Sequence, residues 1–383
     1  MRGPGLDRRS VLVGGASALA APALVQAQSG DIVLGATVPL TGPLAGSGQQ
    51  YHWALQLAQD DINAAGGVNG RKVRIAFEDT QASNSVAVNA FIKLARDLNP
   101  PFVFLSSYTT QNLATEPEVA KAKIPVMYAG GADAVHERKN RYMFRLRPYD
   151  TITTTALAKT VIDRVKAKKA GVIYVQDDFG QGSANLVEKL LKDGGVETVG
   201  KESYGVRDND MSAQLLNLKN RGAEVLVAFT YVRDGALVIS GRRALGIDVP
   251  MVTSGATTIP ATLALLDPKD LEKLYSTTDG MLDPAQGPKV AAFVESFTKR
   301  FGVRPDPYGS CYYDGAQMVA DALRKVGPDR EALRDALSKI SGHEGVTQTF
   351  RADGNGNLAH ATAVVQFKPG TKEFTLVDKV SMG

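Results

Sequence analysis

The sequence predicts an α/β protein of two lobes, each built around a parallel β-sheet. The chain has 383 residues, which is more than one domain of ordinary size. From Asp31 onward, short apolar runs alternate with helical patterns, the order typical of parallel sheets with crossover helices. The same alternation starts again after residue 148, and we therefore expect a second lobe of the same type.

The elements of the first lobe follow from hydrophobic periodicity. An apolar strand starts at Ile32, and apolar residues at helical spacing come after the next loop until Gly66 and Gly67 end that helix. Further strands and helices are recognised in the same way. The predicted strands are Ile32–Pro39, Val73–Phe77, Phe102–Leu105 and Ile124–Tyr128, and the predicted helices are Tyr51–Ile62, Ala87–Leu98 and one from about Thr110.

The second lobe repeats this order, and three helices and a short β tail then follow it. A chain that returns in this way crosses between the lobes more than once, and the cleft between lobes is the expected ligand site. The predicted strands are Val172–Val175, Thr198–Tyr204, Glu224–Phe229, Val249–Val252, Thr347–Phe350, Ala363–Phe367 and Phe374–Val377. Of the predicted helices, one starts at Asp150, a second ends at Gly194 and a third runs through Arg243; the last three are Lys289–Arg300, Ser310–Lys325 and Arg330–Ile340.

The N-terminus has the composition of a secretory signal. Basic residues, including the pair Arg8-Arg9, precede an uncharged run of mostly small residues from Ser10 to Ala27. The arginine pair favours the twin-arginine export route over the general one. A membrane anchor is the alternative, but the run contains too few large apolar residues for a span. We expect residues 1–27 to be a signal peptide and the mature protein to lie in the periplasm.

Charge and cysteine content exclude several classes of protein. The formal net charge is +4, and it falls to about +2 without the charged residues of the signal segment, which leaves no basic field for nucleic acid. Cys311 is the only cysteine, so an intramolecular disulfide is impossible. We interpret Cys311 as a small buried apolar residue.

Catalytic and metal-binding patterns are missing from the sequence. It contains no Gly-x-Ser-x-Gly elbow, no phosphate loop and no His-Glu-x-x-His motif, and its four histidines lie far apart. The segment Asp353–Asn357 resembles the start of a calcium loop, but Leu358 and Val364 stand where the turning glycine and the closing glutamate belong, so a tight turn is favoured. We expect no metal and no cofactor.

Hydroxyl groups gather where a predicted apolar strand meets a helix N-terminus, in Leu105–Thr110. A carboxylate there would meet the Ser107 hydroxyl, backbone N–H groups and the positive end of the helix dipole. The alternative is simple N-capping by Ser or Thr. The residues alone leave both interpretations open.

Six motifs are spread over nearly all of the mature chain: Val38–Pro43, Asp61–Arg71, Glu78-Asp79, Asp178–Gly182, Gly222–Val225 and Asp353–Gly356. Together they closely resemble the leucine/isoleucine/valine-binding protein family of ABC importers. The resemblance implies a type I periplasmic binding fold, in which two Rossmann-like lobes with parallel sheets are joined by a three-crossing hinge and close around a ligand. The implied crossings lie near Arg147–Asp150, Asp279–Leu282 and Phe350–Asn355, and the implied lobes are residues 28–148 plus 281–352 and residues 149–280 plus 353–383.

The resemblance also implies the ligand contacts. Ser107 and the loop that contains Gly131, Ala132 and Asp133 would hold a ligand carboxylate, while Phe179 and Tyr231 would cover it from the second lobe. Two pocket positions differ from the family pattern: Ser47 replaces a tryptophan, and Tyr108 adds an aromatic ring beside Ser107, unless that ring faces solvent. The pocket is therefore expected to be reshaped for a flatter or larger side chain.

Two further departures concern the ligand charges. Ala132 stands where the family has a threonine, and Ser254 stands where branched-chain binders have the acidic partner of the ligand ammonium. A buried unpaired ammonium costs several kcal/mol, so either Asp133 or Asp234 supplies the charge or the ligand lacks an ammonium.

The sequence thus favours a solute-binding protein of an ABC transporter that captures a branched-chain, aromatic or related amino acid. The second hypothesis is that the same protein binds a carboxylate without an ammonium, such as an aromatic acid. An exported α/β enzyme that uses Asp177 and Asp178 is a rival, although helix capping explains these residues better. The expected partners are a small carboxylate-bearing ligand and, by resemblance, membrane permease subunits; we expect a monomer.

Overall fold

The computed structural model describes residues 30–382, and its first lobe is built on a parallel sheet. In this part of the chain the sheet has five strands in the order β2-β1-β3-β4-β5, all parallel. Six of the seven residues of β1 are buried, as expected for a strand covered by helices on both faces. The strands are β1 (Ile32–Val38), β2 (Val73–Asp79), β3 (Val103–Phe104), β4 (Val126–Tyr128) and β5 (Met143–Arg145).

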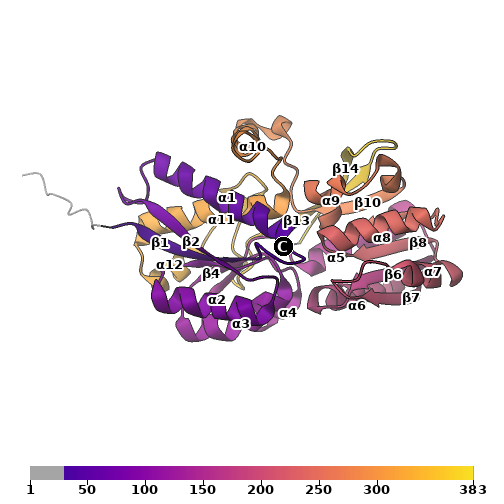
Figure 1. Cartoon of the computed structure of the whole chain (residues 1–383), viewed down its shortest axis with the longest axis horizontal. Coiled ribbons are helices and arrows are strands. Elements are labelled where there is room, and N and C mark those ends of the chain that lie inside the picture. Colours follow the sequence, from indigo (N-terminus) through magenta and orange to yellow (C-terminus); the bar gives the residue numbers. More distant parts are fainter. Residues whose placement is uncertain (1–29, 383) are drawn as a thin grey trace, which may run out of the picture.

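Helices from both ends of the sequence surround the first sheet (Figure 1). The C-terminal helix α11 packs on α1, where the rings of Tyr51 and Tyr312 lie 5.0 Å apart between centroids. The helices of this lobe are α1 (Ala45–Ala64), α2 (Asn84–Asp97), α3 (Thr109–Ala122), α4 (Asp133–Glu137), α10 (Pro288–Phe301), α11 (Pro307–Val326) and α12 (Arg330–Leu337), and a short hairpin of β11 (His343–Glu344) and β12 (Thr349–Phe350) follows them.

The second lobe has a larger, mixed sheet. Its described strands follow the order β14-β13-β10-β9-β8-β6-β7, with antiparallel pairing only at β10-β13 and β13-β14. The strands are β6 (Lys169–Val175), β7 (Glu197–Tyr204), β8 (Val225–Phe229), β9 (Met251–Thr253), β10 (Leu274–Thr278), β13 (Ala361–Phe367) and β14 (Phe374–Ser381), and the helices are α5 (Asp150–Lys159), α6 (Asp178–Asp193), α7 (Ser212–Asn220), α8 (Val232–Ala244) and α9 (Pro260–Ala264).

The chain passes between the lobes three times, after β5, after β10 and before β13. The first and third connections lie side by side, since the backbone N–H of Arg145 donates to Gly356 and that of Leu358 donates to Arg145. The turn that precedes β13 is closed by Asp353, whose carboxylate accepts from the backbone N–H of Asn355 at 2.7 Å. The tight turn predicted at this segment is therefore present.

Two strands of the large sheets escaped the sequence prediction. β5 is only three residues long, which is too short for periodicity to be recognised. β10 has the sequence Leu-Tyr-Ser-Thr-Thr, and its hydroxyl groups disguise a buried strand. Ser276 Oγ satisfies its hydrogen-bonding capacity on the carbonyl of Ser254 at 3.1 Å, so a polar residue is accommodated in the core.

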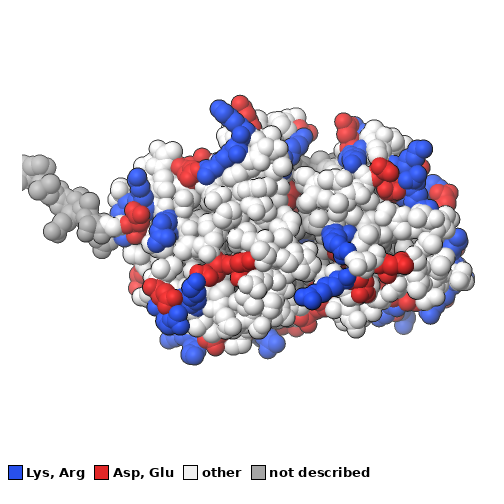
Figure 2. All heavy atoms as spheres, in the orientation of Figure 1, with Lys and Arg blue, Asp and Glu red and all other residues white. Residues whose placement is uncertain are grey.

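Several sequence predictions can be placed on this fold. Cys311 is buried, as predicted. The signal peptide lies outside the described residues, and the lobe boundaries remain a prediction. None of the helices within residues 30–382 has the length and apolar character of a membrane span. Figure 2 shows acidic and basic side chains interspersed over one face of the molecule, with no field of a single sign on that face.

Candidate ligand site between the lobes

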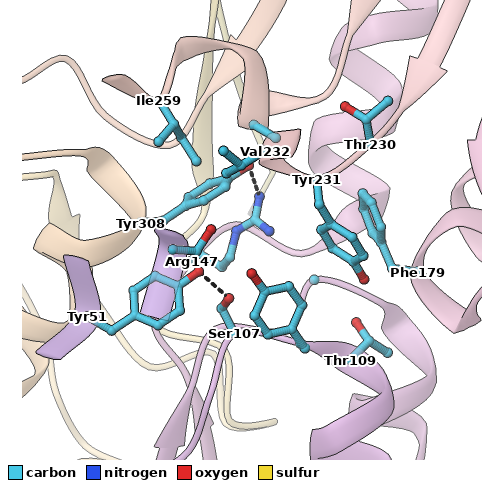
Figure 3. Close-up of a pocket in the computed structure, with 14 residues that line it drawn as sticks. Tyr51, Ser107, Thr109, Arg147, Phe179, Thr230, Tyr231, Val232, Ile259 and Tyr308 are labelled. Carbon is cyan, nitrogen blue, oxygen red and sulfur yellow. Dashed lines mark hydrogen bonds between the residues drawn. The ribbon is translucent and has the colours of Figure 1, made fainter. Parts of the chain in front are cut away.

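A cavity lies between the lobes, at the carboxyl ends of strands from both sheets (Figure 3). This is where ligands of parallel α/β sheets bind. Ser107, Gly131 and Arg147 follow β3, β4 and β5, while Phe179 and Tyr231 follow β6 and β8. The lining consists of Ser47, Tyr51, Ser107, Tyr108, Thr109, Gly131, Arg147, Phe179, Thr230, Tyr231, Val232, Ala256, Ile259 and Tyr308.

Hydroxyl groups of the first lobe form one wall of the cavity. The hydroxyl of Tyr51 lies 2.5 Å from Ser107 Oγ, so one of the two donates to the other and one hydroxyl hydrogen remains for a ligand. The ring of Tyr108 lies in the same wall, beside Ser47 and Tyr51. Burial raises the pKa of both Tyr51 and Tyr108, so both phenols stay neutral and can donate.

Arg147 brings a positive charge to the cavity. Its Nε donates to Asp279 Oδ2 at 2.7 Å, and its Nη2 donates to Asp279 Oδ1 at 3.3 Å and to the Tyr308 hydroxyl at 3.2 Å. The guanidinium also lies over the Tyr308 ring, 4.3 Å from its centroid. Burial alone would lower the pKa of Arg147, but the nearby Asp279 carboxylate outweighs it and the pKa is raised.

These contacts leave donors that face the cavity. Within the described part of the chain, Nη1 of Arg147 has no hydrogen-bond partner. The Tyr308 hydroxyl accepts from Arg147, so its own hydrogen is free to donate. Together with one hydrogen of the Tyr51–Ser107 pair, these groups can bind one carboxylate through charge-assisted hydrogen bonds.

Aromatic rings of the second lobe form the opposite wall. The rings of Phe179 and Tyr231 are stacked with centroids 5.5 Å apart, and Tyr108 meets Tyr231 edge to face at 5.0 Å. The Tyr231 hydroxyl donates to Asp177 Oδ2 at 2.6 Å, and Asp177 also caps helix α6 by accepting from the Gly180 N–H at 2.9 Å. A flat apolar group can therefore stack against rings that are already held in place.

Six of the residues predicted from the sequence come together in this lining: Ser47, Ser107, Tyr108, Gly131, Phe179 and Tyr231. Tyr108 is 3% exposed, which rules out the solvent-facing alternative. Gly131 has a specific reason to be glycine, because a Cβ there would lie 2.1 Å from Asp150 Oδ1.

Three predicted residues, Ala132, Asp133 and Ser254, do not line the cavity. The carbonyls of Gly131 and Ala132 accept from the buried guanidinium of Arg145, both at 2.9 Å, which turns this loop toward a structural contact. Asp133 accepts from the Thr151 hydroxyl on the far side of the loop. Ser254 Oγ accepts from the Thr230 N–H at 3.2 Å and donates to the Thr230 carbonyl, so both functions of its hydroxyl are used between β8 and β9.

The alternative partner for an ammonium, Asp234, is also engaged elsewhere. Its carboxylate accepts from the Tyr204 hydroxyl at 2.5 Å and from the Tyr231 N–H at 3.1 Å, and it is not part of the lining. Among the described lining residues there is one cation, Arg147, and no carboxylate. An ammonium group placed in this cavity would have no anionic side chain on its walls.

Sequence reasoning missed Arg147, Tyr308 and Tyr51. The sequence places Arg147 at a hinge crossing, and the strand before it, β5, is too short to mark it as a site residue. Tyr308 follows Asp306, which caps α11 by accepting from the Gly309 N–H at 2.6 Å. Tyr51 was counted as a core residue of its helix, because periodicity does not distinguish a core position from one at the edge of a cavity.

A two-lobed α/β fold with an enclosed cavity between the lobes defines a solute-binding protein. Residues 31–372 match the periplasmic binding protein family, and the chain belongs to it. A Leu/Ile/Val-binding protein homolog 7 of Brucella abortus is 28% identical over 361 residues, which cover 89% of this chain and 90% of the relative. A homolog 8 of Brucella suis is 27% identical over 76% of each chain.

Solved structures confirm the type I periplasmic binding fold. The branched-chain amino acid substrate binding protein LivJ of Streptococcus pneumoniae, in complex with isoleucine, has a TM-score of 0.83 at 22% identity and covers 91% of this chain and 99% of its own. A solute binding protein of an ABC transporter from R. palustris, in complex with benzoate, has a TM-score of 0.83 at 17% identity and covers 92% and 97%.

Members of this family bind solutes and are not catalysts, so the rival interpretation as an enzyme is wrong. The structure gives the physical reason for Asp177 and Asp178. Asp177 is occupied by Tyr231 and by the cap of α6, while Asp178 is exposed in the first turn of that helix.

Proposed function

We propose that this protein is exported to the periplasm and captures an aromatic monocarboxylate without an ammonium group for an ABC transporter. The observation that carries the choice of ligand is the charge of the described lining, which has one guanidinium and no carboxylate. Of the two ligand classes favoured by the sequence, this composition supports the second.

The physical argument rests on charge burial. A ligand carboxylate would meet Arg147 Nη1 and neutral hydroxyl donors, so its charge is compensated. The ammonium of an amino acid would be enclosed with the same guanidinium, and leaving it without an anionic partner costs several kcal/mol. Two acidic groups next to the cavity are already engaged, since Asp279 is paired with Arg147 and Asp177 accepts from the Tyr231 hydroxyl.

The aromatic character of the ligand is supported by the walls. Four tyrosines and Phe179 line the cavity, and such faces favour a planar ring over a branched aliphatic chain. Structures of the same fold hold isoleucine in one case and benzoate in another, so the fold is compatible with both ligand classes.

Matched pairs of ligands test this proposal. We expect phenylpropionate, benzoate and 4-methylpentanoate to raise the midpoint of thermal unfolding, the aromatic acids most, because a ligand that binds only the folded state stabilises it. Phenylalanine differs from phenylpropionate, and leucine from 4-methylpentanoate, only by the added ammonium group. Both amino acids should produce little shift. Stabilisation by the amino acids alone would reject the proposed ligand class.

Export and lobe organisation belong to the same proposal. Residues 1–27 would be removed on export, and residues 28–148 plus 281–352 would close as one lobe on residues 149–280 plus 353–383, as a monomer. N-terminal sequencing of protein recovered from the periplasm tests the cleavage site. The change R8K/R9K should block export if the twin-arginine route is used, whereas normal export of that variant would indicate the general route.

A further inference from the structure

A second hollow adjoins the ligand cavity. We call it the outer hollow. The two spaces have Ser47, Tyr108 and Val232 in common, so a wall one residue thick lies between them. The remaining lining of the outer hollow is Pro43, Leu44, Gly46, Arg233, Ala261 and Leu265.

Both lobes build the outer hollow. Leu44 and Ser47 belong to the start of α1 in the first lobe, while Val232 begins α8 and Ala261 lies on α9 in the second. The outer hollow is therefore complete only in the arrangement of lobes that also encloses the ligand cavity. A ligand that touched both spaces would contact both lobes at each of them.

The walls of the outer hollow are apolar and uncharged apart from one cation. Leu265 is 61% exposed, more than the other large hydrophobic side chains on the described surface. Arg233 donates to the Asp208 carbonyl and to the Asn209 side chain, so its charge is engaged away from the hollow. An apolar surface of this kind, next to a binding cavity, favours contact with an apolar group.

The wall between the two spaces contains one small side chain. Ser47 is 4% exposed and lies beside Tyr108 in the lining of both spaces. A substituent that leaves the ligand cavity next to Ser47 meets a side chain with only one heavy atom beyond Cβ. Passage on this side requires a smaller displacement than passage past the rings of Phe179 and Tyr231, which are stacked on one another.

We infer that the outer hollow is a subsite for an apolar substituent of the ligand, so that the ligand class is an aromatic carboxylate with an alkyl or aryl extension. This inference rests on the proposed function, since the carboxylate and the ring occupy the cavity beside Arg147. The extension carries no charge, because the described walls of the outer hollow offer no anionic partner and their one cation, Arg233, is engaged by Asp208 and Asn209.

Calorimetric titration with benzoates that carry hydrogen, methyl, ethyl or butyl groups at the para or meta position tests the inference. In one of the two series we expect affinity to rise about threefold to fourfold per methylene until the outer hollow is filled. The variant L265N should remove most of this gain for butylbenzoate and leave benzoate affinity within about twofold. The exposed Leu376, on β14 and outside both linings, provides the matched control L376N, which should change neither.

The results of these titrations distinguish failure of the subsite inference from failure of the proposed function. If benzoate binds while affinity stays flat or falls with chain length in both series, the outer hollow is no subsite and the proposed function stands. If L265N and L376N weaken the binding of long and short acids equally, Leu265 makes no specific contact with the extension and the inference is wrong. If no acid of either series binds, the proposed function fails and the subsite falls with it.

Discussion

The guanidinium of Arg147 forms an ion pair with the carboxylate of Asp279, 2.7 Å away, and the two residues belong to different connections between the lobes. Arg147 follows β5 on the first connection and Asp279 follows β10 on the second. The cation offered to the ligand is thus positioned by the hinge itself. A ligand carboxylate at Nη1 would join a cluster that already spans two of the three crossings.

Replacement of Arg147 should affect stability and binding in separable ways. R147M leaves Asp279 buried without a partner, which should cost about 3 to 5 kcal/mol of unfolding free energy. In R147M/D279N the stability should largely return, because no buried charge is left unpaired. Binding of the aromatic acid should weaken by about tenfold or more in both variants. Denaturant unfolding and calorimetry distinguish the two effects, and unchanged affinity in the double variant would place the carboxylate elsewhere.

The Tyr51–Ser107 pair should behave as one donor. S107A and Y51F each remove one hydroxyl of a pair 2.5 Å apart, and each should weaken binding by roughly 1.5 to 3 kcal/mol without unfolding the protein. Because both changes disrupt the same hydrogen-bond chain, the double variant should lose less than the sum of the single losses. A double-mutant cycle by calorimetry measures this, and strict additivity would contradict a shared donor.

Stability should depend on pH through Asp150. Burial raises the pKa of this carboxyl to about 7, although Arg147 and Arg145 oppose the shift. The folded protein therefore holds a proton that the unfolded chain releases near pH 4, and the stabilisation present at low pH is lost as pH rises toward 7. In D150N this loss is absent, so the variant should gain on the wild type by about 1.4 kcal/mol per pH unit between pH 5 and 7. Unfolding free energies at pH 5, 6 and 7 check the slope, and a constant difference would contradict the assignment.

Gly131 should not tolerate a methyl group. In G131A the new Cβ would meet Asp150 Oδ1 at 2.1 Å, and relief of this contact must move the loop that lines the cavity. We expect a loss of about 1 to 3 kcal/mol in stability together with weaker binding. G182A is the matched control, since no atom lies within 4 Å of a Cβ there and the residue is inside α6. That change should be neutral or stabilising by up to about 1 kcal/mol, and equal thermal shifts for the two variants would refute the steric argument.

The fold could be predicted because both sheets are covered by helices, which makes their strands readable as apolar runs. Strand β8 illustrates this, with all five residues from Val225 to Phe229 buried. Strand β10 could not be recognised, since the hydroxyl of Ser276 is satisfied by the carbonyl of Ser254, a partner that only the three-dimensional structure provides.

The site could be predicted where a residue follows a recognised strand, as Ser107 and Phe179 do. Arg147 could not be found in this way, because β5 is too short to be recognised and the role of Arg147 depends on Asp279, which lies 132 residues further along the chain. The same limit applies to Ser254. Its position suggested a ligand contact, but its hydroxyl is used by the Thr230 backbone on the neighbouring strand.

The contact between the Tyr231 hydroxyl and Asp177 has a consequence for the speed of capture. Tyr231, Phe179 and Asp177 all belong to the second lobe, and Asp177 is fixed by the N-terminus of α6. The stacking surface is thus preorganised whether or not the lobes are closed, and its side-chain entropy is lost when the protein folds rather than when the ligand arrives. In the proposed closure the second lobe contributes a finished half-site, so the hinge motion, and not rotamer rearrangement of Phe179 and Tyr231, is expected to limit the rate of ligand enclosure.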